Sequence, residues 1–140
     1  MTIFKHDPLY WGISAMMSKQ LMGFMGVNDE VIAGLAPEQR GLLDPVVDYL
    51  NSVAPHSAGA AFDSKATMPN ERIAAIRAPT LIIHATEDTL RLFHNAEFAC
   101  AAISSARLNG FEKGGHLLIA VEPPTIESLA QRFILANIGK

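Results

Sequence analysis

The sequence predicts an α/β fold in which a helical N-terminal half is followed by a strand-helix-strand-helix unit with parallel strands. Two observations support this prediction. Residues 80–85 and 106–111 are short runs with strand character, and the segment between them has the apolar spacing of a helix, as in a parallel crossover unit. Residues 9–25 instead repeat apolar side chains every three or four positions, as amphipathic helices do. At 140 residues, the chain has the length of one compact domain.

The first half carries helix signals and no convincing strand. The helix over 9–25 should end at Gly26. It contains four of the six methionines, whose flexible side chains suit either a core or an adaptable apolar binding surface. A short helix over 29–34 and another after Pro37 should follow, and Asp44-Pro45 has the form of an N-cap with proline in the first helical position.

Residues 52–70 contain several serines, alanines and prolines without a clear period, and we expect a connector there. It would close a helical segment of residues 1–70, which precedes a second unit at 71–140 within the same domain. Asn70 stands where it could cap a short helix over 71–76.

The second unit should contain the sheet. Because strand 80–85 has apolar residues at successive positions, it should be buried on both faces, as in a parallel sheet covered by helices. A helix within 92–103 separates it from strand 106–111. The final helix should start after Pro123-Pro124 and stop at Gly139.

Two side chains that follow the strands are the candidate catalytic residues. Asp88 comes shortly after the first strand, and His116 follows the second strand through the turn Gly114-Gly115. A carboxylate and a histidine at neighbouring strand ends are two members of a nucleophile, base and orienter arrangement. Taken singly, Asp88 could instead be a helix N-cap and His116 a surface-loop histidine.

The stretch Pro79-Thr80-Leu81-Ile82-Ile83-His84-Ala85-Thr86-Glu87-Asp88, the helix after it and Gly114-Gly115-His116 together resemble the C-terminal third of the α/β-hydrolases. In that family a strand ending in glycine and aspartate is followed roughly thirty residues later by the catalytic histidine. The resemblance implies a partial α/β-hydrolase fold, with Asp88 as the acid, His116 as the base and residues 1–70 as a cap-like segment. It also favours Asp88 over Glu87 as the orienter. Ala85 departs from the family, which usually has glycine there.

The nucleophile of this family lies in a Gly-x-Ser-x-Gly turn upstream of the acid. The sequence has no such motif. The nearest candidates are Ser14, which has only the first glycine and lies in a helical pattern, and Ser57, which lacks the first glycine and a preceding strand. The chain therefore resembles the C-terminal part of a serine esterase, hydrolysing carboxylic esters or related bonds, with the nucleophile-bearing half missing. We expect it to be inactive alone. The alternatives are a non-catalytic dimeric remnant and a small apolar-ligand-binding module.

Tyr10 and Trp11 could line a substrate pocket under a cap, although core or interface packing is the alternative. We expect no cofactor and no metal site, because the histidines show no ligand spacing and Cys100 is the only cysteine. Cys100 itself should be a small buried filler on a helix.

The composition narrows the possible partners. With 49% hydrophobic and 18% charged residues the chain should fold, and a net charge of −3 without a cluster of lysines and arginines argues against nucleic acid. The apolar run 9–17 is interrupted at residue 18, too early for a membrane span, so a cytoplasmic location is the default expectation. A two-stranded sheet leaves an unpaired edge, and we expect a homodimer through strand 80–85 or the helix over 9–25.

Overall fold

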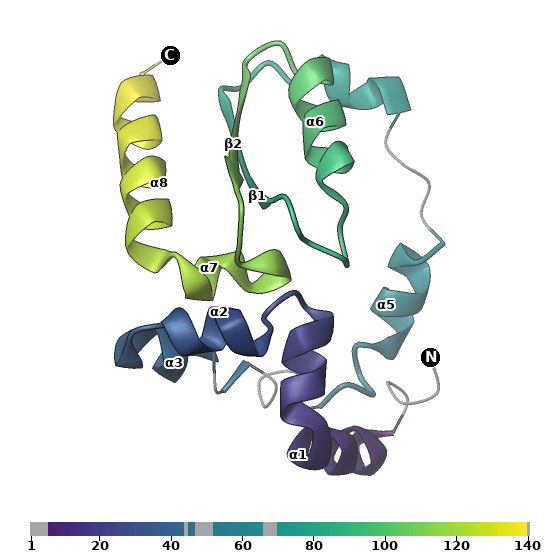
Figure 1. Cartoon of the computed structure of the whole chain (residues 1–140). Coiled ribbons are helices and arrows are strands. Elements are labelled where there is room, and N and C mark those ends of the chain that lie inside the picture. Colours follow the sequence, from purple (N-terminus) through teal and green to yellow (C-terminus); the bar gives the residue numbers. More distant parts are fainter. Residues whose placement is uncertain (1–5, 44, 47–51, 66–69, 140) are drawn as a thin grey trace.

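A computed structural model describes residues 6–43, 45–46, 52–65 and 70–139. The described chain is mixed α/β, with a helical N-terminal half below a two-stranded parallel sheet and its flanking helices (Figure 1). Among these residues, no helix combines the length and the apolarity that a membrane span requires.

The first helix, α1 (Asp7–Phe24), begins slightly earlier than the pattern predicts, with Pro8 in its first turn. It is kinked at Met17, whose φ of −131° and ψ of 30° are not helical. Asp7 also ties the start of α1 to a distant segment, because its Oδ1 accepts a 2.8 Å hydrogen bond from the Ala54 N–H. Gly26 follows the helix with a φ of 86°, which confirms it as the stop.

Two short helices follow as predicted, α2 (Asp29–Gly34) and α3 (Pro37–Leu43). The Asn28 side chain caps α2 by accepting a 3.0 Å hydrogen bond from the Val31 N–H. The predicted cap at Asp44 lies outside the described residues.

The connector predicted over 52–70 is wrong in part, because Ser57–Asp63 form a helix, α5. Its alanine-rich sequence has good helix propensity but no apolar stripe, so periodicity alone does not reveal it. The 3₁₀ helix η2 (Asn70–Ala75) matches the predicted short helix. The side chain of Asn70 is not among those described, so its predicted role as a helix cap stays a prediction.

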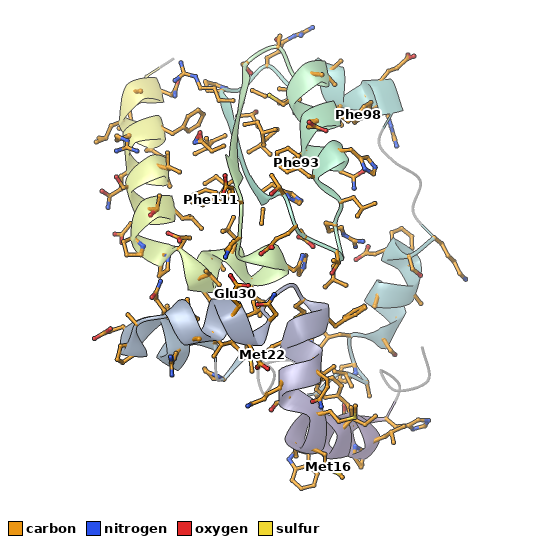
Figure 2. All side chains as sticks on the ribbon, in the orientation of Figure 1. Met16, Met22, Glu30, Phe93, Phe98 and Phe111 are labelled. Atoms are coloured by element: carbon orange, nitrogen blue, oxygen red, sulfur yellow. The ribbon has the colours of Figure 1, made fainter. Side chains whose placement is uncertain are left out.

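The strands have the predicted bounds. β1 (Thr80–Ala85) and β2 (Ala106–Phe111) pair in parallel, from Thr80 opposite Ala106 to Ala85 opposite Phe111. The helices α6 (Phe93–Ala102) and α8 (Pro123–Asn137) lie on opposite sides of this sheet (Figure 1). Figure 2 shows Phe93 on the α6 side and Phe111 on the α8 side.

The prediction that β1 is buried on both faces is wrong for the described residues. Thr80 to His84 remain partly exposed, and only Ala85 is buried. The prediction assumed a sheet with strands on both sides of β1, whereas the described sheet has only β1 and β2. In addition, α8 has no fully buried residue, so it covers its face of the sheet incompletely.

The main core lies outside the sheet. It joins the end of α1 and the helices α2 and α3 to the 3₁₀ helix η3 (Gly115–Leu117) and the short helix α7 (Leu118–Val121). Its buried side chains are Met22, Val27, Val31, Leu35, Leu43, Leu117, Ala120 and Val121. The N-terminal helices therefore pack on the segment that contains and follows His116.

Candidate active site

Asp88 is buried just beyond the carboxyl end of β1, with 6% of its surface exposed. Its Oδ1 accepts hydrogen bonds from two backbone N–H groups, Leu90 at 2.8 Å and Arg91 at 2.9 Å. Its Oδ2 lies 3.0 Å from Nδ1 of His116. The loop after β1 thus fixes one carboxylate oxygen and leaves the other to the histidine.

The carboxyl of Asp88 is held in its ionised form. Burial by itself raises its pKa, because it removes the charged form from water. The Arg91 N–H, the His116 imidazole and the Leu90 N–H outweigh this effect, so the pKa lies below its ordinary value. A carboxylate only accepts hydrogen bonds, so Nδ1 of His116 must be the donor. In the neutral imidazole, Nε2 then carries the free lone pair.

The turn before His116 depends on two glycines in the left-handed region. Gly114 has a φ of 112°, and a Cβ there would lie 2.7 Å from Cδ1 of Leu118. Glu87 holds this turn, because its Oε1 accepts a 3.0 Å hydrogen bond from the Gly114 N–H. Glu87 is therefore not the orienter of His116 in this structure. It positions the turn while Asp88 contacts the imidazole.

The helical half fixes His116 from the other side. The His116 N–H donates a 2.7 Å hydrogen bond to the Met25 carbonyl. Gly26 lies against Gly115 so closely that a Cβ on Gly26 would be 2.6 Å from the Gly115 Cα. Sequence reasoning identified Gly26 only as a helix stop and missed this contact. The sequence does have a glycine in each of the two turns, which is consistent with a close contact. Nothing in the sequence pattern shows, however, that these two turns pack against each other.

Further contacts join the two halves near the site. The Thr89 hydroxyl donates to the Phe24 carbonyl at 3.0 Å, and the Gln39 amide donates to the Val121 carbonyl. Lys113 forms an exposed 2.7 Å ion pair with Glu30, which Figure 2 labels on α2 beside the segment containing α7. Because water and salt screen exposed pairs, the backbone contacts hold the histidine turn more firmly than this ion pair does.

A pocket of about 470 Å³ opens beside the Asp88 and His116 pair. Its apolar walls include Ile83 from β1, Ile119 from α7 and Ile126 from α8. The side chain of His116 lines the pocket and is 43% exposed. Within the described part of the chain, Nε2 has no hydrogen-bond partner. The pair therefore presents an unused base to an apolar pocket.

The structure brings Asp88 and His116 together, as predicted, but it does not bring Tyr10 or Trp11 to this pocket. Tyr10 is buried within α1, and Trp11 is exposed on the same helix. Their assignment as substrate contacts stays a prediction that the pocket does not support.

The weak serine candidates are also placed elsewhere. Ser14 is buried in α1 and donates to the Trp11 carbonyl at 3.0 Å, while Ser57 donates to the Ala54 carbonyl at 2.8 Å. No serine, threonine or cysteine of the described chain lines the pocket. The described lining of the pocket therefore supplies no nucleophile for an acid and base pair to activate.

Cys100 lies on α6 and is half-buried rather than fully buried. No group of three or more histidine, cysteine, aspartate or glutamate side chains among the described residues could hold a metal ion.

No protein-family model, curated protein or solved structure matched this chain. The resemblance to the α/β-hydrolases therefore stays a prediction from the sequence, carried mainly by the residues from Pro79 to His116. The geometry of the Asp88 and His116 pair supports a narrower chemical statement than the family resemblance does. An ionised Asp88 can hold His116 in one tautomer and stabilise the imidazolium that forms when Nε2 takes a proton.

Proposed function

We propose that this chain carries the acid and base of a serine-hydrolase-like site for carboxylic esters, and that the nucleophile is supplied from outside these 140 residues. The observation that carries the proposal is the 3.0 Å contact between Asp88 Oδ2 and His116 Nδ1, beside a pocket whose described lining residues include no hydroxyl or thiol. By itself the chain is inactive toward esters.

The completed site would use each group in a defined way. Nε2 of His116 takes the proton from an attacking hydroxyl and returns it to the leaving group. Asp88 keeps the imidazole in the required tautomer and stabilises its cation. The apolar wall of the pocket suits the acyl or alcohol part of an ester.

The edge of β1 that faces away from β2 offers a place where the segment that supplies the nucleophile could add. Thr80 and Thr86 direct their N–H groups toward the β2 side, onto the carbonyls of Ser105 and Phe111. Because the direction alternates along a strand, Leu81, Ile83 and Ala85 direct theirs to the opposite edge. No described strand pairs with that edge. A strand added there would lie beside the pocket that Ile83 and Ala85 line.

An introduced thiol tests whether His116 can activate a nucleophile in this pocket. Ile119 and His116 both line the pocket, so a thiol at position 119 would share this cavity with the imidazole. In a Cys100→Ser background, we expect the thiol of Ile119→Cys to be alkylated by iodoacetamide several-fold faster at neutral pH than in the same variant carrying His116→Ala. Equal rates would contradict the proposal.

The unmodified chain should not hydrolyse esters. With a chromogenic short-chain ester, the unmodified chain and His116→Ala should give equal, background rates. Hydrolysis by the unmodified chain that is lost in His116→Ala would show that the chain needs no external nucleophile.

A second candidate is a small apolar-ligand-binding module. It is favoured by the apolar lining of the pocket, to which Leu118 and Ile119 contribute. Saturable binding of an apolar probe, together with no effect of His116 on the alkylation rate, would favour this module over the hydrolase-like site.

A further inference from the structure

A second pocket lies between α8 and the sheet, near the amino ends of the strands. It measures about 360 Å³, at the lower end of the range for small-molecule sites. Leu81, Leu129, Phe133 and Ala136 form its apolar part. We call it the arginine pocket, because Arg107 of β2 and Arg132 of α8 line it together with Asn109.

The alternation of side chains along β2 places its polar residues at this pocket. Residues two apart on a strand share a face, so Arg107 and Asn109 lie on the same face as Phe111. Figure 2 shows Phe111 on the side that faces α8. The cover that α8 gives this face is incomplete, because Arg107 is exposed, as is Arg132 of α8, while Asn109 is half-buried. A ligand can therefore reach both guanidinium groups from solvent.

These polar groups have no partners within the chain as described. Arg107 and Arg132 form no ion pair or hydrogen bond with any residue of the described ranges. The half-buried side chain of Asn109 likewise has no hydrogen bond to a described residue. Two like charges beside one cavity repel each other, and no acidic residue of the described chain lines it. Among the described lining residues, the site therefore offers donors and positive charge without a carboxylate to balance them.

We propose that the arginine pocket binds an organic monocarboxylate with an apolar body, such as a medium-chain fatty acid. Planar guanidinium groups match a carboxylate through paired N–H donors. The Asn109 amide can donate a further hydrogen bond. The apolar wall of the pocket would cover the hydrocarbon body of such a ligand. Inorganic phosphate has no apolar part, so it would make no use of this wall.

The proposal does not depend on catalysis at His116. The two pockets lie toward opposite ends of α8, since Ile126 lines the first, and Phe133 and Ala136 line the arginine pocket. Binding of a carboxylate can thus succeed or fail independently of the hydrolase-like activity.

Octanoate is the probe for calorimetric titration, at concentrations below micelle formation, with octanol as the uncharged control. Arg107→Gln and Arg132→Gln should each weaken octanoate binding roughly tenfold, because each removes a charge-assisted hydrogen-bond donor. The double variant should lose measurable binding. Arg77→Gln is the matched control, because Arg77 is exposed and lines neither pocket, and it should bind as the unmodified chain does.

A direct readout places the ligand. Octanoate should shift the side-chain amide resonances of Asn109 in ¹⁵N spectra, and Ala136→Leu should abolish binding by filling the apolar wall. Circular dichroism confirms that each variant is folded. Equal octanoate affinity in the unmodified chain and the double arginine variant, octanol binding as tightly as octanoate, or no octanoate binding to the unmodified chain would overturn the proposal.

Discussion

The backbone N–H of His116 donates a 2.7 Å hydrogen bond to the carbonyl of Met25, so the helical half directly holds the turn that presents the candidate base. The neighbouring residues Gly26 and Gly115 make this possible, since either Cβ would collide with the opposite backbone. The position of the imidazole therefore depends on residues about ninety positions earlier in the chain.

Gly26→Ala should destabilise the protein and loosen the histidine turn. The left-handed conformation at a φ of 86° alone costs an alanine about 1–2 kcal/mol, and the collision with Gly115 adds to this. Gly23→Ala is the control, because its Cβ position inside α1 has no atom within 4 Å beyond the adjoining backbone of its own helix, and it should be neutral or slightly stabilising. Urea unfolding and the imidazole resonances of His116 measure the two effects. A Gly26→Ala variant as stable as Gly23→Ala would contradict the close contact.

Asp88 should contribute stability that depends on pH. Its folded pKa is depressed, so its contribution is present above the ordinary carboxyl pKa of about 3.9 and is lost as the pH falls through the lower folded value. The unfolding free energy of the unmodified chain should therefore exceed that of Asp88→Asn at neutral pH. The difference should shrink below about pH 4. Urea titrations from pH 7 to pH 2 measure it, and a difference that does not vary with pH would count against the ionised pair.

Leu43→Ala should cost roughly 2–5 kcal/mol, because Leu43 is only 2% exposed in the core that joins α3 to α7. The neighbouring Leu42 is 48% exposed, so Leu42→Ala should cost well under half as much. Chemical denaturation of both variants tests whether the N-terminal helices share one cooperative core with the segment after His116. Equal costs at the two positions would place that core elsewhere.

We expect two copies of the chain to associate through α1. Trp11 and Met16 are exposed on this helix, Met16 at 86%, and burying such apolar side chains favours association. Light scattering at micromolar concentration should give the mass of a dimer, and Trp11→Lys with Met16→Lys should give a monomer. Ile134→Lys changes an exposed apolar residue of α8 and should leave the dimer intact. A monomer for the unmodified chain would refute the dimer.

Local patterns predicted much of the C-terminal unit. The bounds of β1 follow from a run of apolar and β-branched residues directly after Pro79, and those of β2 from its place between the predicted helix and the glycine turn. The ends of α8 follow from Pro123 and Gly139. The pairing of Asp88 with His116 was predictable because parallel strands bring their carboxyl ends to the same edge.

Other features depend on packing between distant segments. The helix Ser57–Asp63 has no apolar stripe to reveal it, and the partial exposure of β1 depends on which strands flank it. Glu87 and Asp88 are adjacent carboxylates in the sequence, and only the fold shows that Glu87 holds the Gly114 turn while Asp88 contacts the imidazole.

By itself the sequence determined the two strands, the helix between them and the positions of Asp88 and His116 after them, because strand propensity and turn residues are local properties. Only the tertiary structure decided how His116 is held and what lies around it. The contact of Gly26 with Gly115, the apolar pocket beside His116 and the meeting of Arg107 from β2 with Arg132 from α8 at one pocket all join segments whose separation in the chain carries no periodic signal. Such contacts arise when apolar faces pack, and packing is a property of the whole fold.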